Sequence, residues 1–309
     1  SQQRVFQLGV ADRLAQLHFI QALTALGKCY KSQSRLDEAA EQFAAAVRAA
    51  TELDQSSFSM VDDKHRLAML LVSLGDIYRP AGQFKLAKTQ YVLGSQAYEE
   101  LNRHDPEESD FAFEQMSVLK QFGLMLRNSL QEHEESEKAL DLATARAEGL
   151  VDRFPNDPRF QSELAICQHV LAWGIFERDG TRANALWQQA ISHQATALEL
   201  APNAPQYATY LRLHNQSLAE FLAGQETPTG EDLARATELV QRALEIGETA
   251  TSYQVLGWIQ YRQGEPTAAI ASLERSIQLA EGNADSFQWF VLAMALAKLG
   301  ETDKAREWK

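Results

Sequence analysis

Residues 253–261 decide the fold, and they read Tyr-Gln-Val-Leu-Gly-Trp-Ile-Gln-Tyr. Large apolar side chains recur in this stretch at the three- and four-residue spacing that gives a helix one apolar face. Gly257 lies at its centre, and Ala269, Leu273 and Ser276 follow at helical spacing farther along the chain. Because small side chains let two helix backbones approach closely, the stretch predicts the first helix of an antiparallel helix pair.

The same arrangement returns along the whole chain, each time around a small residue that serves as a marker. The separation between markers is 48 residues at the start of the chain and 36 at its end. One helix pair cannot bury its apolar stripe alone, so neighbouring pairs must stack on one another. The seven markers are Gly27, Gly75, Gly123, Gly174, Ala219, Gly257 and Ala293.

Two of the units carry extra residues between marker and second helix. Ala139 and Ala190 each follow their marker by sixteen residues, whereas Ala269 follows Gly257 by twelve. This spacing predicts a lengthened turn in both units. In the third unit it predicts that residues 131–135 form a solvated loop or an extra helical turn.

The pattern of an aromatic residue, Leu-Gly, a tyrosine and later small residues resembles the tetratricopeptide repeat. The resemblance implies an all-α fold, a right-handed superhelical solenoid of antiparallel helix pairs with about seven units. We expect one solenoid over residues 1–309, with its last unit incomplete. The approximate units are 1–58, 59–104, 109–156, 159–203, 205–247, 250–282 and 284–309.

Three further segments, residues 154–165, 207–220 and 286–300, resemble the repeat regions that follow serine/threonine kinase domains in planctomycete-type bacteria. This resemblance implies a bacterial signalling protein with a kinase domain upstream. The chain begins at Ser1 without a methionine and ends inside a helical pattern, so we expect a fragment of a longer protein. The sequence has no glycine-rich phosphate loop, His-Arg-Asp segment or Asp-Phe-Gly segment, so kinase activity is not assigned to these residues.

Composition excludes several classes of partner. The formal net charge is −13, which repels a phosphate backbone and an anionic membrane surface. The longest apolar runs fall well short of the ~20 residues of a membrane span. We therefore expect a cytoplasmic protein that binds neither nucleic acid nor membrane. Cys29 and Cys167 both lie in apolar helical patterns, and we interpret them as small core residues.

The sequence offers no constellation for catalysis or metal binding. Its seven histidines include no two that are three or four residues apart, the spacing a helical metal site requires. Cys167 and His169 are two apart, so on a helix they point in different directions. Runs of carboxylates such as residues 132–137 are typical of solvated helix faces. We therefore expect no catalytic residue, no metal and no cofactor.

The first helices are expected to line a concave face, and several cations lie on that face. Five units carry a basic residue four or five positions after the marker, and two further lysines lie nearby. This strip would attract an acidic peptide or a C-terminal carboxylate. Alternatively, a cation at the end of a helix stabilises the helix dipole by ~0.3–1 kcal/mol. The cations are Lys28, Lys31, Arg79, Lys120, Arg127, Arg178 and Arg262.

Aromatic residues replace the cations near the C-terminal end. Trp258, Phe287, Phe290 and Met294 are expected on the inner face, where exposed aromatic and methionine side chains are typical of a peptide anchor site. The alternative is that they pack against a helix outside this sequence, and the same alternative applies to Trp308.

These patterns favour a scaffold that binds a peptide or partner domain in its groove. A chaperone C-terminus is a poor ligand, because the asparagines of the defined Lys/Asn clamp are missing. Two other hypotheses remain: a small-ligand sensor or enzyme accessory subunit with a pocket inside the superhelix, based on the long loops near Gln131 and Thr227, and self-association through the C-terminal end.

Overall fold

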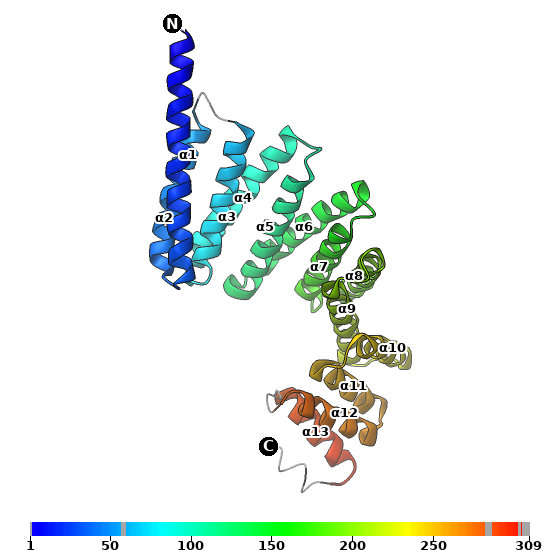
Figure 1. Ribbon diagram of the computed structural model, residues 1–309. Coiled ribbons are helices and arrows are strands. Elements are labelled where there is room, and N and C mark those ends of the chain that lie inside the picture. Colours follow the sequence, from blue (N-terminus) through cyan, green and yellow to red (C-terminus); the bar gives the residue numbers. More distant parts are fainter. Residues whose placement is uncertain (1, 57–59, 282–285, 302–303, 305–309) are drawn as a thin grey trace. The chain divides into compact units, whose positions relative to one another are not determined.

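A computed structural model of the protein describes residues 2–56, 60–281, 286–301 and 304, with side chains from residue 12 onward (Figure 1). Within these ranges the chain forms thirteen α-helices and one short π-helix, and no strand. Trp308 lies outside the described residues. The predicted all-α fold is confirmed.

The chain divides into two compact units, Ser1–Phe154 and Pro155–Lys309. The first unit contains α1 (Gln2–Ser32), α2 (Leu36–Asp54), α3 (Val61–Tyr78), α4 (Phe84–His104), α5 (Ser109–Met125), η1 (Leu126–Leu130) and α6 (His133–Arg153). The second contains α7 (Pro158–Ile175), α8 (Gly180–Leu200), α9 (Pro205–Gly224), α10 (Gly230–Ile246), α11 (Ala250–Gln263), α12 (Pro266–Leu279) and α13 (Ser286–Lys298).

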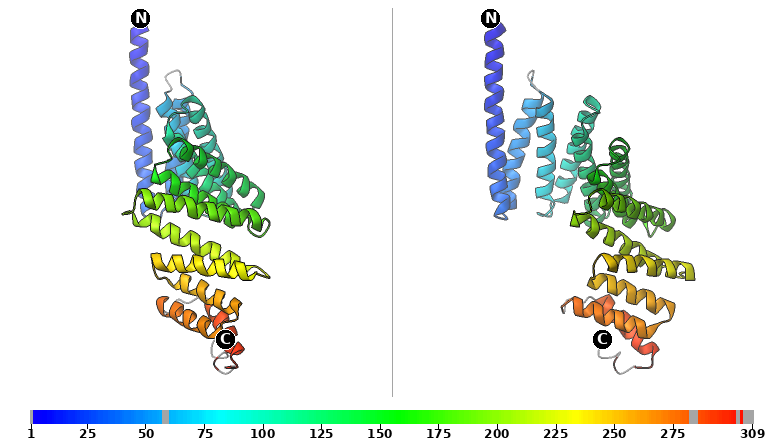
Figure 2. Two further views of the ribbon diagram at one scale, coloured as in Figure 1. Left: turned by 90° about the vertical axis from the view of Figure 1, so that its right-hand side faces the viewer. Right: turned by 45° about the vertical axis from the view of Figure 1, so that its right-hand side comes forward.

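Within each unit, every helix packs most closely against its neighbours along the chain (Figure 2). The strongest contacts join α1 to α2, α3 to α4 and α5 to α6, and the same alternation continues from α7 to α12. The predicted arrangement of about seven helix pairs is therefore confirmed as six pairs followed by α13. A single solenoid over residues 1–309 stays a prediction.

The helix ends follow from local chemistry. The side chain of Asp157 accepts a hydrogen bond from the backbone N–H of Arg159, and Pro158 begins α7. Proline suits this position because the first turn of a helix does not need its N–H. At the C-terminal end of α11, the capping residue Gly264 has a φ of 84°, a left-handed conformation that only glycine adopts without strain.

The marker glycines are required by contact with the second helix of their own pair. A Cβ atom on Gly27 would lie 2.6 Å from the ring of Phe43, and one on Gly257 would lie 2.7 Å from Leu273. Both distances are far below van der Waals contact. The Leu-Gly motif therefore marks the point where the two backbones of a pair come closest.

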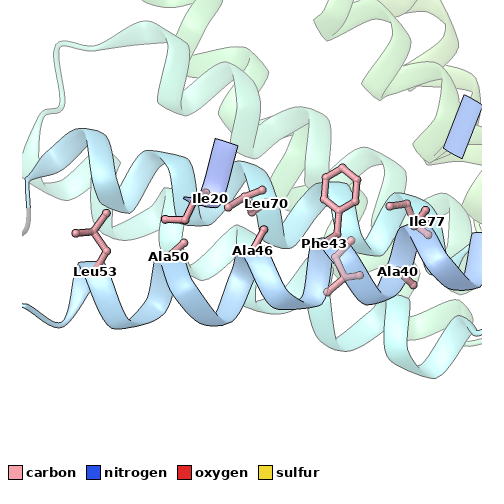
Figure 3. Packing of buried hydrophobic residues seen from close by; sticks show 10 residues of the cluster. Ile20, Ala40, Phe43, Ala46, Ala50, Leu53, Leu70 and Ile77 are labelled. Atoms are coloured by element: carbon pink, nitrogen blue, oxygen red, sulfur yellow. The ribbon is translucent and has the colours of Figure 1, made fainter. Parts of the chain in front are cut away.

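The core of the first unit forms where α1 and α3 meet over α2 (Figure 3). Ile20 of α1 and Leu70 of α3 are both buried against this helix. The face that α2 supplies is rich in alanine, since Ala40, Ala46 and Ala50 belong to the same cluster. The small residues of α2 thus allow α1 and α3 to share one core.

The extra residues of the third and fourth repeat units lie partly in helices and partly in a longer linker. In unit three, α5 continues into the π-helix η1 and the chain then turns at Gln131, so residues 133–135 already belong to α6. In unit four, α8 begins at Gly180, ten residues before Ala190, whereas α12 begins only three residues before Ala269. The extra helical turn predicted for the third unit is therefore confirmed at residues 133–135, and its linker is not lengthened. The linker of the fourth unit, residues 176–179, is two residues longer than residues 264–265 of the sixth, and the rest of its extra residues lengthen α8.

One of the two cysteines also differs from the prediction. Cys167 is buried, as expected, but Cys29 is exposed on α1. The interpretation of Cys29 as a core residue was wrong because the apolar pattern around it belongs to a helix face that no neighbouring helix covers among the described residues.

Candidate functional site

The first candidate surface is a groove of about 370 Å³ between α1 and α3. Buried Ile20 and Leu70 form its apolar floor. Two cations line it, Lys28 from α1 and Arg66 from α3. α2 packs against both α1 and α3, and its residues share one core with the two floor residues.

Arg66 has an unusual environment in this groove. Its Nε atom is buried and has no hydrogen-bond partner among the described residues. A buried charged donor without a partner is unfavourable, so such a group is a natural place for an acceptor such as a carboxylate. Together with Lys28, Arg66 gives a positively charged site in a protein whose net charge is −13.

Of the other cations predicted in the first compact unit, Lys31, Arg79 and Arg127 lie near helix ends, and Lys120 lies within α5. Lys31 is in the last turn of α1 and Arg79 follows α3, and both are exposed. Lys120 on α5 and Arg127 on η1 are half-buried. Of these five cations, Lys28 is the one that lines the groove with Arg66.

The two cations predicted in the second unit are Arg178 and Arg262. Arg178 follows α7 and is exposed. Arg262 donates hydrogen bonds to the carbonyl oxygens of Gln225 (2.8 Å) and Glu226 (3.1 Å), just beyond the end of α9. This contact favours the helix-end interpretation for Arg262, because cations are favoured beside C-terminal carbonyl groups.

The second candidate surface is an aromatic patch on α11 and α13. Trp258 and Tyr261 of α11 stack with their centroids 5.9 Å apart, and Phe287 of α13 meets Trp258 edge-on at 5.6 Å. Phe287 is 41% exposed and Phe290 is 62% exposed. The two helices are first helices of successive units, so the repeat places their aromatic residues side by side.

The aromatic patch rests on a buried cluster and carries cations at its edge. Trp258 and Met294 are half-buried against the cluster that contains Leu273 and Leu292. The guanidinium of Arg262 lies 5.1 Å from the centre of the Trp258 ring, and the ammonium of Lys298 lies 5.1 Å from the centre of the Tyr261 ring. Both distances fit cation–π interactions. The structure thus brings Trp258, Arg262 and Phe287 together.

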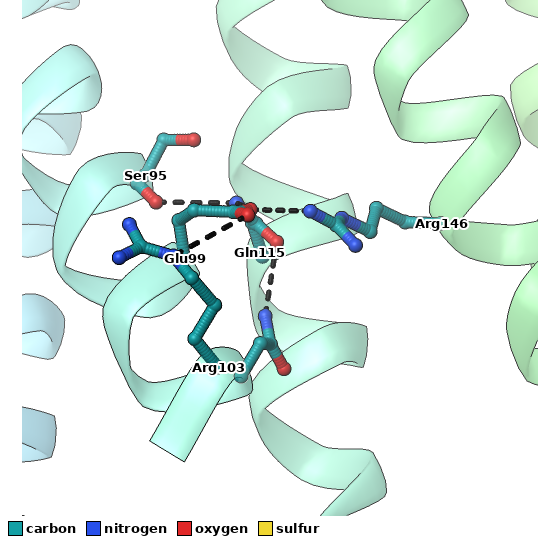
Figure 4. A network of polar contacts seen from close by, with 6 residues as sticks. Ser95, Glu99, Arg103, Gln115 and Arg146 are labelled. Carbon is teal, nitrogen blue, oxygen red and sulfur yellow. Dashed lines mark hydrogen bonds and ion pairs between the residues drawn. The ribbon is translucent and has the colours of Figure 1, made fainter. Parts of the chain in front are cut away.

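A polar network joins α4, α5 and α6 in the first unit (Figure 4). Gln115 is buried and donates to the Glu99 carboxylate (2.9 Å) and to the carbonyl oxygen of Ser95 (3.2 Å). Asn102 donates to Gln115, and Arg146 pairs with Glu99. The bond from Gln115 is the main cause that lowers the pKa of Glu99. These bonds tie α4 to α5 and α6, so the network helps to fix the packing of the three helices.

A pair of buried histidines joins α7 and α9. The Nδ1 atoms of His169 and His214 lie 2.9 Å apart, and the rings are 8% and 1% exposed. Burial lowers the pKa of His169 to about 4, and burial together with His169 lowers that of His214 to about 3. Each histidine lies five residues before its marker, Gly174 or Ala219, so the repeat register is the one sequence signal that could have paired them.

The described residues contain no group of three or more His, Cys, Asp or Glu side chains arranged to hold a metal ion. None of the helices in the described part of the chain has the length and hydropathy needed to cross a bilayer. The sequence interpretation missed two cations. Arg66 lines the groove together with Lys28, and Lys298 lies over the Tyr261 ring at the edge of the aromatic patch.

Two segments of the chain match a family model described as tetratricopeptide repeat, residues 20–52 and residues 250–283. The first lies on α1 and α2, and the second covers α11 and α12. The chain therefore contains tetratricopeptide repeats. No match to a curated protein is found.

Two solved structures resemble most of the chain. The crystal structure of BtubC (BKLC) from P. vanneervenii has a TM-score of 0.55 and 15% identity, over 81% of this chain and 93% of that one. The assembly chaperone of RpL4, Acl4 (residues 1–338), has a TM-score of 0.53 and 14% identity, over 93% of this chain and 99% of that one. At such low identity the likeness establishes the shared helical-repeat fold.

Proposed function

We propose that this chain is a protein-interaction scaffold that anchors a segment of a partner protein on the aromatic patch of α11 and α13. The observation that carries the proposal is the exposure of Phe287 and Phe290 beside half-buried Trp258. Large aromatic side chains on a rigid support are the usual anchors of protein interfaces, because they bury much apolar area with little loss of freedom.

The partner segment is a peptide with an apolar anchor and a nearby carboxylate. The apolar side chain fits the aromatic patch, and the carboxylate fits its edge, where Arg262 and Lys298 lie over the rings. Arg262 has one guanidinium nitrogen engaged with backbone carbonyls, which holds the group in place. A carboxylate on the partner would therefore meet a cation that is already oriented.

The experiment uses fluorescent peptides that carry one aromatic anchor, with either Glu or Gln next to it. We expect the Glu peptides to bind more tightly, and we expect Phe290→Ala to weaken both series. Leu213→Ala is the matched control, because Leu213 is an exposed apolar residue of the same unit on α9 and lies outside the patch. Equal binding by the Phe290→Ala and wild-type chains would overturn the proposal.

A second candidate function is the capture of a small carboxylate in the groove between α1 and α3. The groove volume of about 370 Å³ lies within the range of ligand pockets, and the unpartnered Nε of Arg66 favours an anionic ligand. Thermal shift with a set of mono- and dicarboxylates tests it. We expect stabilisation that is lost in Arg66→Gln and kept in Lys31→Gln, because Lys31 is a cation of α1 that does not line the groove. A flat response leaves the scaffold as the remaining candidate.

The wider setting of the scaffold is also a proposal. The three segments that resemble kinase-associated bacterial repeats support a signalling role in the cytoplasm, in which the repeats recruit substrates for a kinase domain of the same polypeptide. The complete reading frame tests this directly. A frame without a kinase domain would remove the kinase link and leave the anchoring of a partner untouched.

A further inference from the structure

The helix α1 carries an apolar stripe on the face opposite the groove. Phe19 is 57% exposed and Leu26 is 43% exposed. Ala15, Ala22 and Cys29 are exposed as well, and they alternate with the two large residues at spacings of four and three. This alternation is the heptad spacing of a coiled-coil seam. The stripe is therefore shaped to receive another helix.

The repeat register shows what covers the same face elsewhere in the first unit. Phe19, Ala22, Leu26 and Cys29 lie at fixed distances from Gly27, and α3 has residues at the same distances from Gly75. Those residues of α3 pack into one core with α2. In α3 they are Leu67, Leu70, Leu74 and Ile77.

α5 is the first helix of the third helix pair, and the same face of α5 is also covered by a second helix. Val118, Phe122 and Met125 take the corresponding positions counted from Gly123, and they pack into one core with residues of α4 such as Ala87. A second helix thus covers this face of α3 and of α5. On α1 no helix covers it among the described residues, and the site for an added helix is already built.

The helix that fits must present small residues, because α2 covers α3 with an alanine-rich face. The stripe of α1 itself has this property at every second position. If two copies of α1 pair antiparallel about a point between Phe19 and Ala22, Phe19 of each copy faces Ala22 of the other. In the same register Leu26 faces Ala15. A parallel pair would instead set Phe19 against Phe19, and large side chains placed against small ones pack better.

Charge does not oppose this pairing at the seam. The whole chain has a net charge of −13, so two copies repel each other at long range. The residues that border the stripe of α1 are uncharged or weakly basic, however: Gln16, His18, Leu23, Ala25 and Tyr30. Asp12 is the one acidic neighbour, at the end of the stripe, and in the antiparallel register it faces Cys29 of the other copy.

We propose that the stripe Ala15–Phe19–Ala22–Leu26–Cys29 is the interface of a two-fold symmetric dimer formed by an antiparallel pair of α1 helices. Such an interface is self-complementary, since each contact occurs twice. It lies in the first compact unit, whereas the aromatic patch proposed as the partner site lies in the second, so each can hold if the other fails.

The first test is the mass of the chain in solution, measured by analytical ultracentrifugation over a wide concentration range. We expect a shift from the monomer mass of 34.6 kDa to twice that value as concentration rises. Phe19→Glu should abolish the shift without loss of helicity, because Phe19 is exposed in the monomer. Phe290→Glu is the matched control, an exposed phenylalanine at the other end of the chain, and should leave the dimer intact.

The second test fixes the register by a cross-link. Asp12→Cys places a thiol opposite native Cys29 of the other copy, and mild oxidation should give a disulfide-linked dimer. Adding Cys29→Ser to that variant should remove the cross-link, while Cys167 is buried and does not interfere. A chain that stays monomeric at every concentration, a dimer that survives Phe19→Glu, or a failed cross-link would each overturn the proposal.

Discussion

The buried pair His169 and His214 should make the packing of α7 against α9 sensitive to acid. Their Nδ1 atoms share one hydrogen bond at 2.9 Å, so one ring donates and the other accepts. Both pKa values are lowered, to about 4 and about 3, mainly because burial disfavours the charged ring. Tyr210 stacks on His214, and the hydrogen bond and ring contacts described for the pair involve no charged group.

The sign and size follow from proton linkage. Below pH ~6.5 the unfolded chain protonates both histidines while the folded chain does not, so stability falls as the pH falls. The loss continues until the lowered folded pKa values are reached. At pH 5 each histidine costs about 2 kcal/mol, and the pair about 4 kcal/mol, relative to pH 7. His193 on α8, whose pKa is also lowered by burial, acts in the same direction.

Amide hydrogen exchange measures this change locally, once intrinsic exchange rates are corrected for pH. We expect the free energy of opening of α7 and α9 to fall by about 4 kcal/mol from pH 7 to pH 5. The double variant His169→Gln/His214→Gln removes most of this dependence, and His104→Gln, which alters an exposed histidine of α4, does not. An equal pH dependence in the wild-type chain and the double variant would refute the reasoning.

Three further predictions concern the helix pairs themselves. Ala269→Leu adds bulk where α12 meets Gly257 of α11 and should cost about 1–3 kcal/mol by urea unfolding; an unchanged midpoint would show that the register of this pair is wrong. Gly264→Ala should cost about 1–2 kcal/mol in the same assay, because φ of 84° is left-handed; a smaller cost would mean that the turn relaxes. A hydrogen bond to Glu114 raises the pKa of His65, so the pair stabilises α3 against α5 at acid pH and loses this effect as the pH rises through the raised pKa; His65→Gln should flatten that dependence in hydrogen exchange of α3.

The helix pairs could be predicted from the chain because their signal is local. Gly257 and Leu273 are sixteen residues apart, within one helix–turn–helix, and their contact is required by the period of the helix and the length of the turn. The aromatic patch was predictable for the same reason, since Trp258 and Phe287 occupy equivalent helix faces of successive units. Its edge was not, because the reach of Lys298 to the Tyr261 ring depends on how far apart α11 and α13 lie.

Other features required the structure. The extra residues of the third repeat unit could have formed a loop, but the chain turns at Gln131 after the π-helix and residues 133–135 belong to α6. Arg262 was expected on the inner face with the other cations, but its guanidinium reaches carbonyl groups 36 and 37 residues away. Such contacts join separate helix pairs, so the periodicity within one helix does not encode them.

The sequence by itself determined that this chain is a series of helix pairs, because a 3.6-residue apolar period and a glycine at each close approach leave one way to bury each stripe. The tertiary structure alone decided which stripes are covered. Leu67 and Phe19 stand at the same position of the same pattern, yet Leu67 is half-buried against the core that α2 shares and Phe19 is exposed. The physical reason is that burial depends on a neighbour in space: α2 lies against this face of α3, whereas no helix among the described residues lies against the corresponding face of α1.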